Sequence, residues 1–239
     1  MDKPLILHIE TATDICSVAL SEGDQQLSLV ESGPERSHAT LLNIYIRKVF
    51  EQSRRKLDQV HAVAISKGPG SYTGLRIGVS TAKGLTYALE RPLLALGTLE
   101  NMAYGARNHP SIQKLIDKHG EALLLCPMID ARRMEVYAEF YSTDMTVIRE
   151  VSADIVENNS YGDILDKHHV CFFGNGSEKC EEVLNHAHAH FVNGLHPSAS
   201  NMIIPVLNRY HHDQFEDVAY FEPFYLKDFI ATIPRKKGL

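Results

Sequence analysis

The sequence predicts an α/β fold built from two lobes, each with the element order β-β-β-α-β-α. Two observations predict this fold. The order of strand-like and helix-like segments in the first half recurs in the second half. Each half also opens with an apolar strand that ends in an acid before a hairpin, Ile-Glu-Thr at 9–11 and Ile-Asp-Ala at 129–131. The 239 residues, 44% hydrophobic and 23% charged, suffice for one large or two small globular domains.

The first half begins with three short apolar segments separated by turns, which predict an antiparallel meander. A helix follows, because apolar residues recur at three- and four-residue spacing. A strand, a glycine-rich helix and another strand complete this half. The expected strands are 5–9, 15–20, 26–31, 62–65 and 93–96, and the expected helices are 37–52 and 71–89.

The second half repeats this order. We expect strands at 123–129, 135–141, 146–151, 170–173 and 191–192, and helices at 161–167, 178–184 and 200–211. Residues 1–100 are assigned to the first lobe and 101–211 to the second. The C-terminal segment from about 212 to 239 is expected to pack back, through residues 221–229. Two such lobes facing each other describe the actin-like ATPase (ribonuclease H-like) fold.

The turn Gly-Pro-Gly at 68–70 is the most distinctive local feature. It joins a strand to a helix, and its glycines let the backbone approach another segment closely. A Walker loop is excluded because the chain contains no Gly-Lys-Ser/Thr, and the glycine spacing differs from Gly-x-Gly-x-x-Gly. Amides at the start of the helix could hold an anion. A purely structural turn is the interpretation that we favour.

The helix after this turn carries small residues four positions apart, which form one smooth strip, and the helix at 37–52 carries an apolar stripe. We expect these two surfaces to pair with the same helices of another subunit. The alternative is that both stripes cover their own sheet. The residues concerned are Gly74, Gly78 and Ala82 on one helix, and Leu41, Tyr45 and Val49 on the other.

Four residues at the ends of strands are candidates for a weak nucleotide contact. Glu10 and Asp130 could be paired cleft acids. The favoured alternative is that each acid caps its hairpin by accepting turn amides. Gly174 and Gly176 resemble the adenosine-side turn of an actin-like fold, and they are equally compatible with a plain strand-to-helix connection.

Charge, cysteine content and hydropathy exclude several classes of protein. The net charge of −6 argues against a chain that grips nucleic acid by itself. The four cysteines form no Cys-x-x-Cys pair, which fits a reducing compartment. No stretch approaches the ~18 apolar residues of a membrane span, and the N-terminal apolar run is too short for a signal peptide. We expect a cytoplasmic protein without a membrane partner.

Histidines are frequent in the second half. His186 and His190 would share one face of a helix and could bind a metal ion. No acid stands at an obvious ligand spacing, so we interpret the run at 186–190 as a solvated surface and expect no metal site. The pairs at 168–169 and 211–212 receive the same interpretation.

Several motifs together resemble the TsaB family, also called YeaZ. The resemblance covers the whole chain, and the motifs at 68–78 and 129–137 are specific only in combination. They are Gly-Pro-Gly-Ser-Tyr-Thr-Gly-Leu-Arg-Ile-Gly at 68–78, Ile-Glu-Thr-Ala-Thr at 9–13, Ser-His-Ala at 37–39, Ile-Asp-Ala-Arg at 129–132 with Glu-Val-Tyr at 135–137, and Pro-Phe-Tyr-Leu at 223–226.

The resemblance implies a non-catalytic subunit of the complex that forms N6-threonylcarbamoyladenosine in tRNA next to the anticodon. It implies TsaD, the transferase, and TsaE, an ATPase, as partners, and a homodimer when the chain is isolated. Contact with tRNA would come only through the complex. The chain would have no cofactor of its own, and ATP or ADP would bind through the complex.

Two departures bear on this resemblance. The family usually carries Asp where this chain has Glu10, which weakens the case for nucleotide chemistry in the first lobe. TsaD-type catalysis resembles a metal site on a His-x-x-x-His helix, and the matching region at 96–103 has no histidine. We therefore expect no catalytic residue. The alternatives are a stand-alone actin-like phosphotransferase and a glycoprotease-like M22 peptidase homologue.

Overall fold

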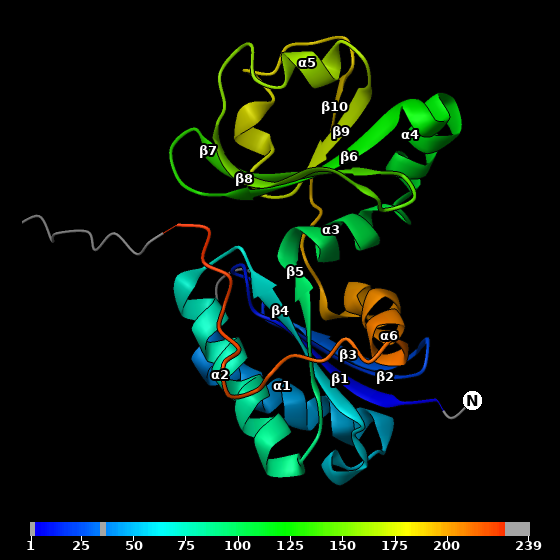
Figure 1. Cartoon of the computed structure of the whole chain (residues 1–239), viewed down its shortest axis with the longest axis vertical. Helices are drawn as coiled ribbons and strands as arrows, with labels where there is room; N and C mark the ends of the chain where they lie inside the picture. The colour runs from blue at the N-terminus through cyan, green and yellow to red at the C-terminus, as the bar shows by residue number, and fades with distance from the viewer. Residues whose placement is uncertain (1–2, 34–36, 228–239) are drawn as a thin grey trace, which may run out of the picture.

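The computed structural model describes residues 3–33 and 37–227. The chain forms two lobes stacked end to end, each built on a five-stranded mixed sheet (Figure 1). The strand orders are β3-β2-β1-β4-β5 in the first sheet and β10-β9-β6-β7-β8 in the second. Read in opposite directions, both sheets are an antiparallel meander followed by two parallel strands. This confirms the predicted duplication and the actin-like ATPase fold.

The elements of the first half lie close to their predicted ranges. The hairpin and turn signals located every strand of this sheet to within a few residues. The strands are β1 Leu5–Glu10, β2 Ser17–Glu22, β3 Gln25–Glu31, β4 Ala62–Gly68 and β5 Leu93–Gly97, and the helices are α1 His38–Ser53 and α2 Tyr72–Leu89, with a 3₁₀ turn η1 at Leu57–Gln59.

The second half contains more helix than expected. Two helices that the prediction lacks, α3 and α4, lie between β5 and β6. The elements are α3 Thr98–Ala106, α4 Pro110–His119, η2 Gly120–Ala122, β6 Leu123–Asp130, β7 Glu135–Ser142, β8 Val147–Ile155, α5 Gly162–Leu165, β9 His169–Phe173, η3 Glu178–Cys180, β10 Ala189–Val192, η4 Ala199–Met202 and α6 Ile203–His211. Within the described ranges, no helix is long and apolar enough to cross a membrane.

The helix predicted at 178–184 is wrong. Only η3 forms there, and the chain continues through turn-type hydrogen bonds, such as Val183 N–H to the Cys180 carbonyl at 3.1 Å. Cys180 and Leu184 are buried, which produced the helical spacing.

Both faces of the first sheet are covered. Leu7 and Ile9 of β1 pack in one cluster with α1 and α2, while Ile6 packs in another with residues of α6. The chain thus returns to the first sheet at η4 and α6, before the expected lobe boundary at 211. Helix α3 lies between the lobes and contacts β6 of the second sheet (Figure 1). Of the expected C-terminal packing, residues 228 and 229 lie outside the described residues.

The residues predicted to contact another subunit pack against their own chain. A Cβ atom at Gly74 would lie 2.2 Å from the Thr11 carbonyl oxygen, and one at Gly78 would lie 2.1 Å from the Thr11 Oγ1. The apolar stripe of α1 packs on the same sheet. The six residues Leu41, Tyr45, Val49, Gly74, Gly78 and Ala82 are buried within their own lobe, as the alternative expected. A contact of these two helices with another subunit stays a prediction.

Candidate functional site

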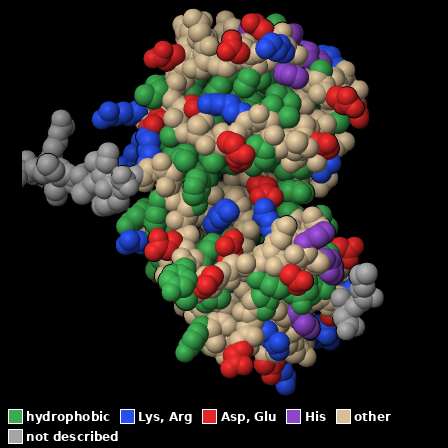
Figure 2. Space-filling view, in the orientation of Figure 1, with side chains coloured by type: hydrophobic (Ala, Val, Ile, Leu, Met, Phe, Trp, Pro, Cys, Tyr) green, Lys and Arg blue, Asp and Glu red, His purple; other side chains and the backbone are tan. Residues whose placement is uncertain are grey.

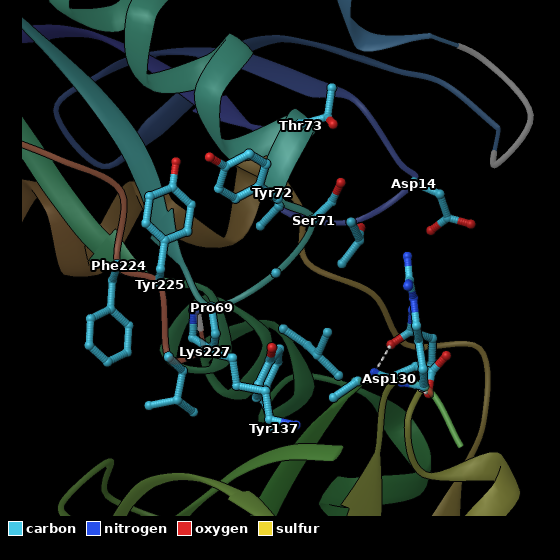
Figure 3. Close-up of a pocket in the computed structure, with 18 residues that line it drawn as sticks. Asp14, Pro69, Ser71, Tyr72, Thr73, Asp130, Tyr137, Phe224, Tyr225 and Lys227 are labelled. Atoms are coloured by element: carbon cyan, nitrogen blue, oxygen red, sulfur yellow. Dashed lines mark hydrogen bonds between the residues drawn. The ribbon is translucent and has the colours of Figure 1, made fainter. Parts of the chain in front are cut away.

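A cleft of about 560 Å³ lies where the two lobes meet (Figure 3). Its walls are the hairpin loops of both lobes, the Gly-Pro-Gly turn and the C-terminal segment. Asp14 of the first lobe and Asp130 of the second lie on opposite walls, while Tyr72 and Tyr225 lie side by side (Figure 3). Charged side chains of both signs also lie at the waist between the lobes (Figure 2).

The Gly-Pro-Gly turn locks two other segments together. The Ser71 N–H donates to the Ala12 carbonyl at 2.6 Å, and a Cβ atom at Gly70 would lie 2.2 Å from that same oxygen. Gly68 has a φ of +113°, and a Cβ atom there would lie 2.6 Å from the Phe224 carbonyl oxygen. Glycine is required because backbone from both ends of the chain presses against the turn.

The C-terminal segment at 221–227 runs along α2 and ends at the cleft (Figure 1). Its Phe224 N–H donates to the Lys67 carbonyl at 2.7 Å. The rings of Tyr225 and Tyr72 have centroids 4.9 Å apart. The Arg76 guanidinium lies 4.3 Å from the Tyr72 ring centre and donates to the Tyr225 hydroxyl at 3.3 Å. These contacts hold an aromatic pair beside the opening.

Glu10 does not line the cleft but is fully buried beneath it. One carboxylate oxygen accepts the Ala12 N–H at 2.7 Å, and the other accepts the Asn101 side-chain amide at 2.6 Å. Burial raises the pKa of Glu10 to about 7, and the hydrogen bonds from Ala12 and Asn101 oppose this rise. The group is therefore half protonated near neutral pH.

The raised pKa of Glu10 makes stability depend on pH. Protonated Glu10 suits its apolar surroundings, whereas the unfolded chain ionises at the ordinary pKa of 4.5. The stabilising contribution is complete below about pH 4.5 and is lost as the pH rises through about 7. The burial of Glu10 therefore affects stability whether or not Glu10 takes part in a reaction.

Asp130 lies at the rim of the second-lobe wall. Its carboxylate accepts a hydrogen bond from the Arg132 N–H at 3.0 Å and forms an ion pair with Lys179. Its own N–H donates to the Asn175 side chain at 3.0 Å. Arg132 has a φ of +73°, which costs about 1–2 kcal/mol for a residue with a Cβ atom. The turn made by Asp130 holds Arg132 in this conformation at the cleft.

The two glycines proposed for nucleotide contact pack against the second sheet. Gly174 has a φ of +99°, and a Cβ atom there would lie 2.4 Å from the Met128 carbonyl oxygen. One at Gly176 would lie 2.8 Å from the Ile129 carbonyl carbon. The residue between them, Asn175, reaches the cleft. These contacts explain both glycines without a ligand.

The predicted acid pair is therefore not brought together at the cleft. Asp130 lines it and Glu10 does not, and each acid accepts a turn amide, as the alternative interpretation expected. Sequence reasoning missed Arg132, Asn175 and the Tyr72–Tyr225 pair as cleft residues. The signals were present, since Asn175 stands between the two glycines and Tyr225 belongs to the motif at 223–226. Nothing local indicated that the motif reaches the cleft.

The fold and the cleft define the class of this protein. It is a two-lobed protein of the actin-like ATPase (ribonuclease H-like) fold, with hairpin loops of both lobes and the C-terminal segment meeting at the cleft.

Comparison with known proteins narrows this class to a family. The model of the family described as TsaD, tRNA N6-adenosine threonylcarbamoyltransferase, matches residues 32–235. The chain belongs to this family, and within it to the TsaB (YeaZ) group. The TsaB protein of Escherichia coli K12, described as a tRNA threonylcarbamoyladenosine biosynthesis protein, is 37% identical over 139 residues, which is 58% of this chain and 55% of that protein.

Two solved structures resemble this fold over nearly the whole chain. YeaZ from Pseudomonas aeruginosa superposes with a TM-score of 0.77 at 25% identity, covering 93% of this chain and 100% of that one. A second P. aeruginosa structure, described as having similarity to peptidase YeaZ, gives a TM-score of 0.80 at 25% identity, covering 94% and 100%. In sequence alignment, by contrast, the chain spans about half the length of the curated relatives it matches.

Proposed function

We propose that this chain is a non-catalytic subunit of the machinery that forms N6-threonylcarbamoyladenosine in tRNA, and that it supports TsaD. The observation that carries the non-catalytic part is the position of Glu10. A phosphotransferase in this fold needs acids at the nucleotide, and Glu10 is buried with both oxygens bonded. The Asp130 carboxylate forms an ion pair with Lys179 and accepts the Arg132 N–H, so its oxygens already have partners within the chain.

A second observation supports this proposal against a peptidase. The segment that corresponds by resemblance to the metal-binding histidine pair of TsaD is the start of α3, and α3 contains no histidine. Its Asn101 side chain instead donates to Glu10 and accepts the Ser198 N–H at 3.3 Å. Through Asn101 the helix is bonded to Glu10 and to Ser198, and it presents no ligand pair.

The proposed partners are TsaD, TsaE and, for the isolated chain, a second copy of itself. The net charge of −6 supports contact with tRNA only through the complex. ATP or ADP would likewise bind within the assembly, where Arg132 and the Tyr72–Tyr225 pair offer a cation and an aromatic face at the cleft. A cytoplasmic location goes with this role.

The contact surface that we propose is the outward face of α1 and α2. A groove between them is lined by Asn43, Ile46, Arg47, Phe50 and Leu85. Gly84 lies on the outward side of α2, and nothing lies within 4 Å of a Cβ atom placed there. This face replaces the buried strip of Gly74 and Gly78.

Co-elution with TsaD on a sizing column tests this proposal. The unchanged chain should co-elute with TsaD. Gly84→Arg should weaken that association while the variant stays folded, because its side chain enters open space. Ser111→Arg adds the same charge on the exposed surface of the second lobe and should co-elute normally. A chain that never associates with TsaD contradicts the function, and equal co-elution of both variants contradicts only the surface.

A further inference from the structure

Four histidines from three separate segments of the chain meet at the edge of the second sheet. In the parallel pairing of β9 with β10, His190 lies opposite Cys171. His169 precedes Cys171 by two residues in β9, so His169 and His190 project from the same face. His188 lies in the turn just before β10, and its ring centroid is 4.2 Å from that of His169. Cys171 packs in one cluster with residues of α4, which covers this face and ends at His119.

The imidazole nitrogens of three of these histidines are close enough to share one ion. One ring nitrogen from each of His119, His169 and His190 lies within 4.8 Å of the others. The His169 Nδ1 and His190 Nε2 are 3.0 Å apart. Around a tetrahedral zinc ion with bonds of 2.0–2.1 Å, ligand nitrogens lie about 3.3 Å apart. The His119 and His169 rings are stacked, so they must turn for their in-plane lone pairs to converge on one ion; the soft χ2 torsion of histidine allows this.

One of these nitrogens lacks any other explanation. The Nε2 of His119 is buried and has no hydrogen-bond partner among the described residues. The His119 ring stacks on that of His169, with centroids 3.7 Å apart, and its centroid is 5.3 Å from that of His190. An unpaired buried nitrogen costs free energy, and a metal ion would satisfy it.

The fourth histidine packs beside the cluster. The His188 Nδ1 lies 2.7 Å from the Leu165 carbonyl oxygen, so it carries the proton and donates. The ring centroids of His188 and His169 are 4.2 Å apart. His188 is thus fixed by the backbone and packs its ring against the ring of His169.

We propose that His119, His169 and His190 bind one divalent transition-metal ion, with Zn²⁺ as the best match. Three imidazoles without a carboxylate or thiolate suit zinc, copper or nickel rather than magnesium or calcium. Three protein ligands leave a fourth position for water or a further ligand. The bound ion would join the end of α4 to the edge strand β10. Figure 2 shows histidines gathered at this end of the second lobe.

Charges around the cluster bear on selectivity. Lys118 precedes His119 and repels cations, which disfavours ions held mainly by charge. Asp166 lies 3.7 Å from His186, outside the three-histidine set. A borderline metal with strong preference for nitrogen is therefore favoured over a hard cation.

Zinc titration of the full chain without a polyhistidine tag tests the proposal, using competition with a chromophoric chelator. We expect one ion per chain, and a melting temperature that rises with zinc. His119→Gln, His169→Gln and His190→Gln should each weaken binding at least about tenfold. His211→Gln, an exposed histidine on α6, is the matched control and should leave binding unchanged.

His119→Gln is the decisive variant, because His119 lies outside the run of alternating histidines at 186–190. If His119→Gln binds zinc as tightly as the unchanged chain while His186→Gln loses it, the linear run is the site and the proposal is wrong. Absence of saturable binding, or equal affinity in all variants, also overturns it. Circular dichroism of each variant confirms that the fold is retained.

Discussion

Two glycines of the same helix should respond in opposite ways to the same substitution. Gly74 and Gly84 both lie in α2, and each can be replaced by alanine. At Gly74 the new Cβ atom would lie 2.2 Å from the Thr11 carbonyl oxygen and 3.0 Å from His38 Cδ2. At Gly84 it would meet nothing within 4 Å. The pair therefore isolates the packing of α2 on the first hairpin.

The magnitudes follow from these contacts. The carbonyl at Thr11 cannot swing away, because the next carbonyl, of Ala12, accepts the Ser71 N–H. Overpacking of this kind costs about 1–3 kcal/mol, so we expect Gly74→Ala to lose about 2 kcal/mol of unfolding free energy. Gly84→Ala should gain about 1 kcal/mol, because alanine favours the helix interior. The variants should differ by about 3 kcal/mol, or roughly 6–12 °C in melting temperature.

Thermal unfolding followed by circular dichroism measures both variants against the unchanged chain. Gly74→Ala should melt lower and Gly84→Ala higher. A Gly74→Ala variant as stable as Gly84→Ala would refute the packing described for α2. It would return the small-residue strip to the role of an exposed interface.

Two further predictions concern the cleft and its surroundings. The unchanged chain should lose stability between pH 5 and pH 8 as Glu10 ionises, and Glu10→Gln should not. In denaturant titrations, the unfolding free energy of Glu10→Gln minus that of the unchanged chain should therefore rise by on the order of 1–3 kcal/mol over that interval. A difference that stays constant with pH contradicts the raised pKa. Tyr225→Ala should speed hydrogen exchange of the Phe224 amide, which donates to the Lys67 carbonyl. Tyr220 is 84% exposed, so Tyr220→Ala is the control and should leave this exchange rate unchanged. Equal protection of the Phe224 amide in both variants refutes the anchoring role of Tyr225.

The succession of strands along both lobes could be predicted because local signals specify it. Hairpin turns and apolar runs located β1 to β5 closely, and the recurrence of an acid after β1 and β6 revealed the duplication. Glycines in the turn at 68–70 indicated close backbone approach, which the structure confirms. What the glycines approach depends on segments far away in the sequence, such as Phe224.

Other features depend on long-range packing that one sequence does not reveal. The same apolar spacing fits a helix on its own sheet and a helix on a partner, so the spacing alone could not show that the stripes of α1 and α2 are buried in their own lobe. Glu10 looks like a cleft acid until Asn101 of α3, a helix that the prediction lacked, is seen to bury it. Likewise, His119 and His169 are separated by 50 positions and meet only through the register of β9 and the end of α4.

Threonylcarbamoylation of tRNA in a reconstituted reaction with TsaD and TsaE tests the proposed non-catalytic, supporting role. Mass spectrometry of digested tRNA would quantify the modified nucleoside with this chain, without it, and with its Asp130→Asn variant. We expect modification that depends on the chain and persists with Asp130→Asn, because an asparagine oxygen can still accept the Arg132 N–H. Modification that proceeds equally without the chain, or that Asp130→Asn abolishes while the complex still assembles, would contradict a non-catalytic supporting role.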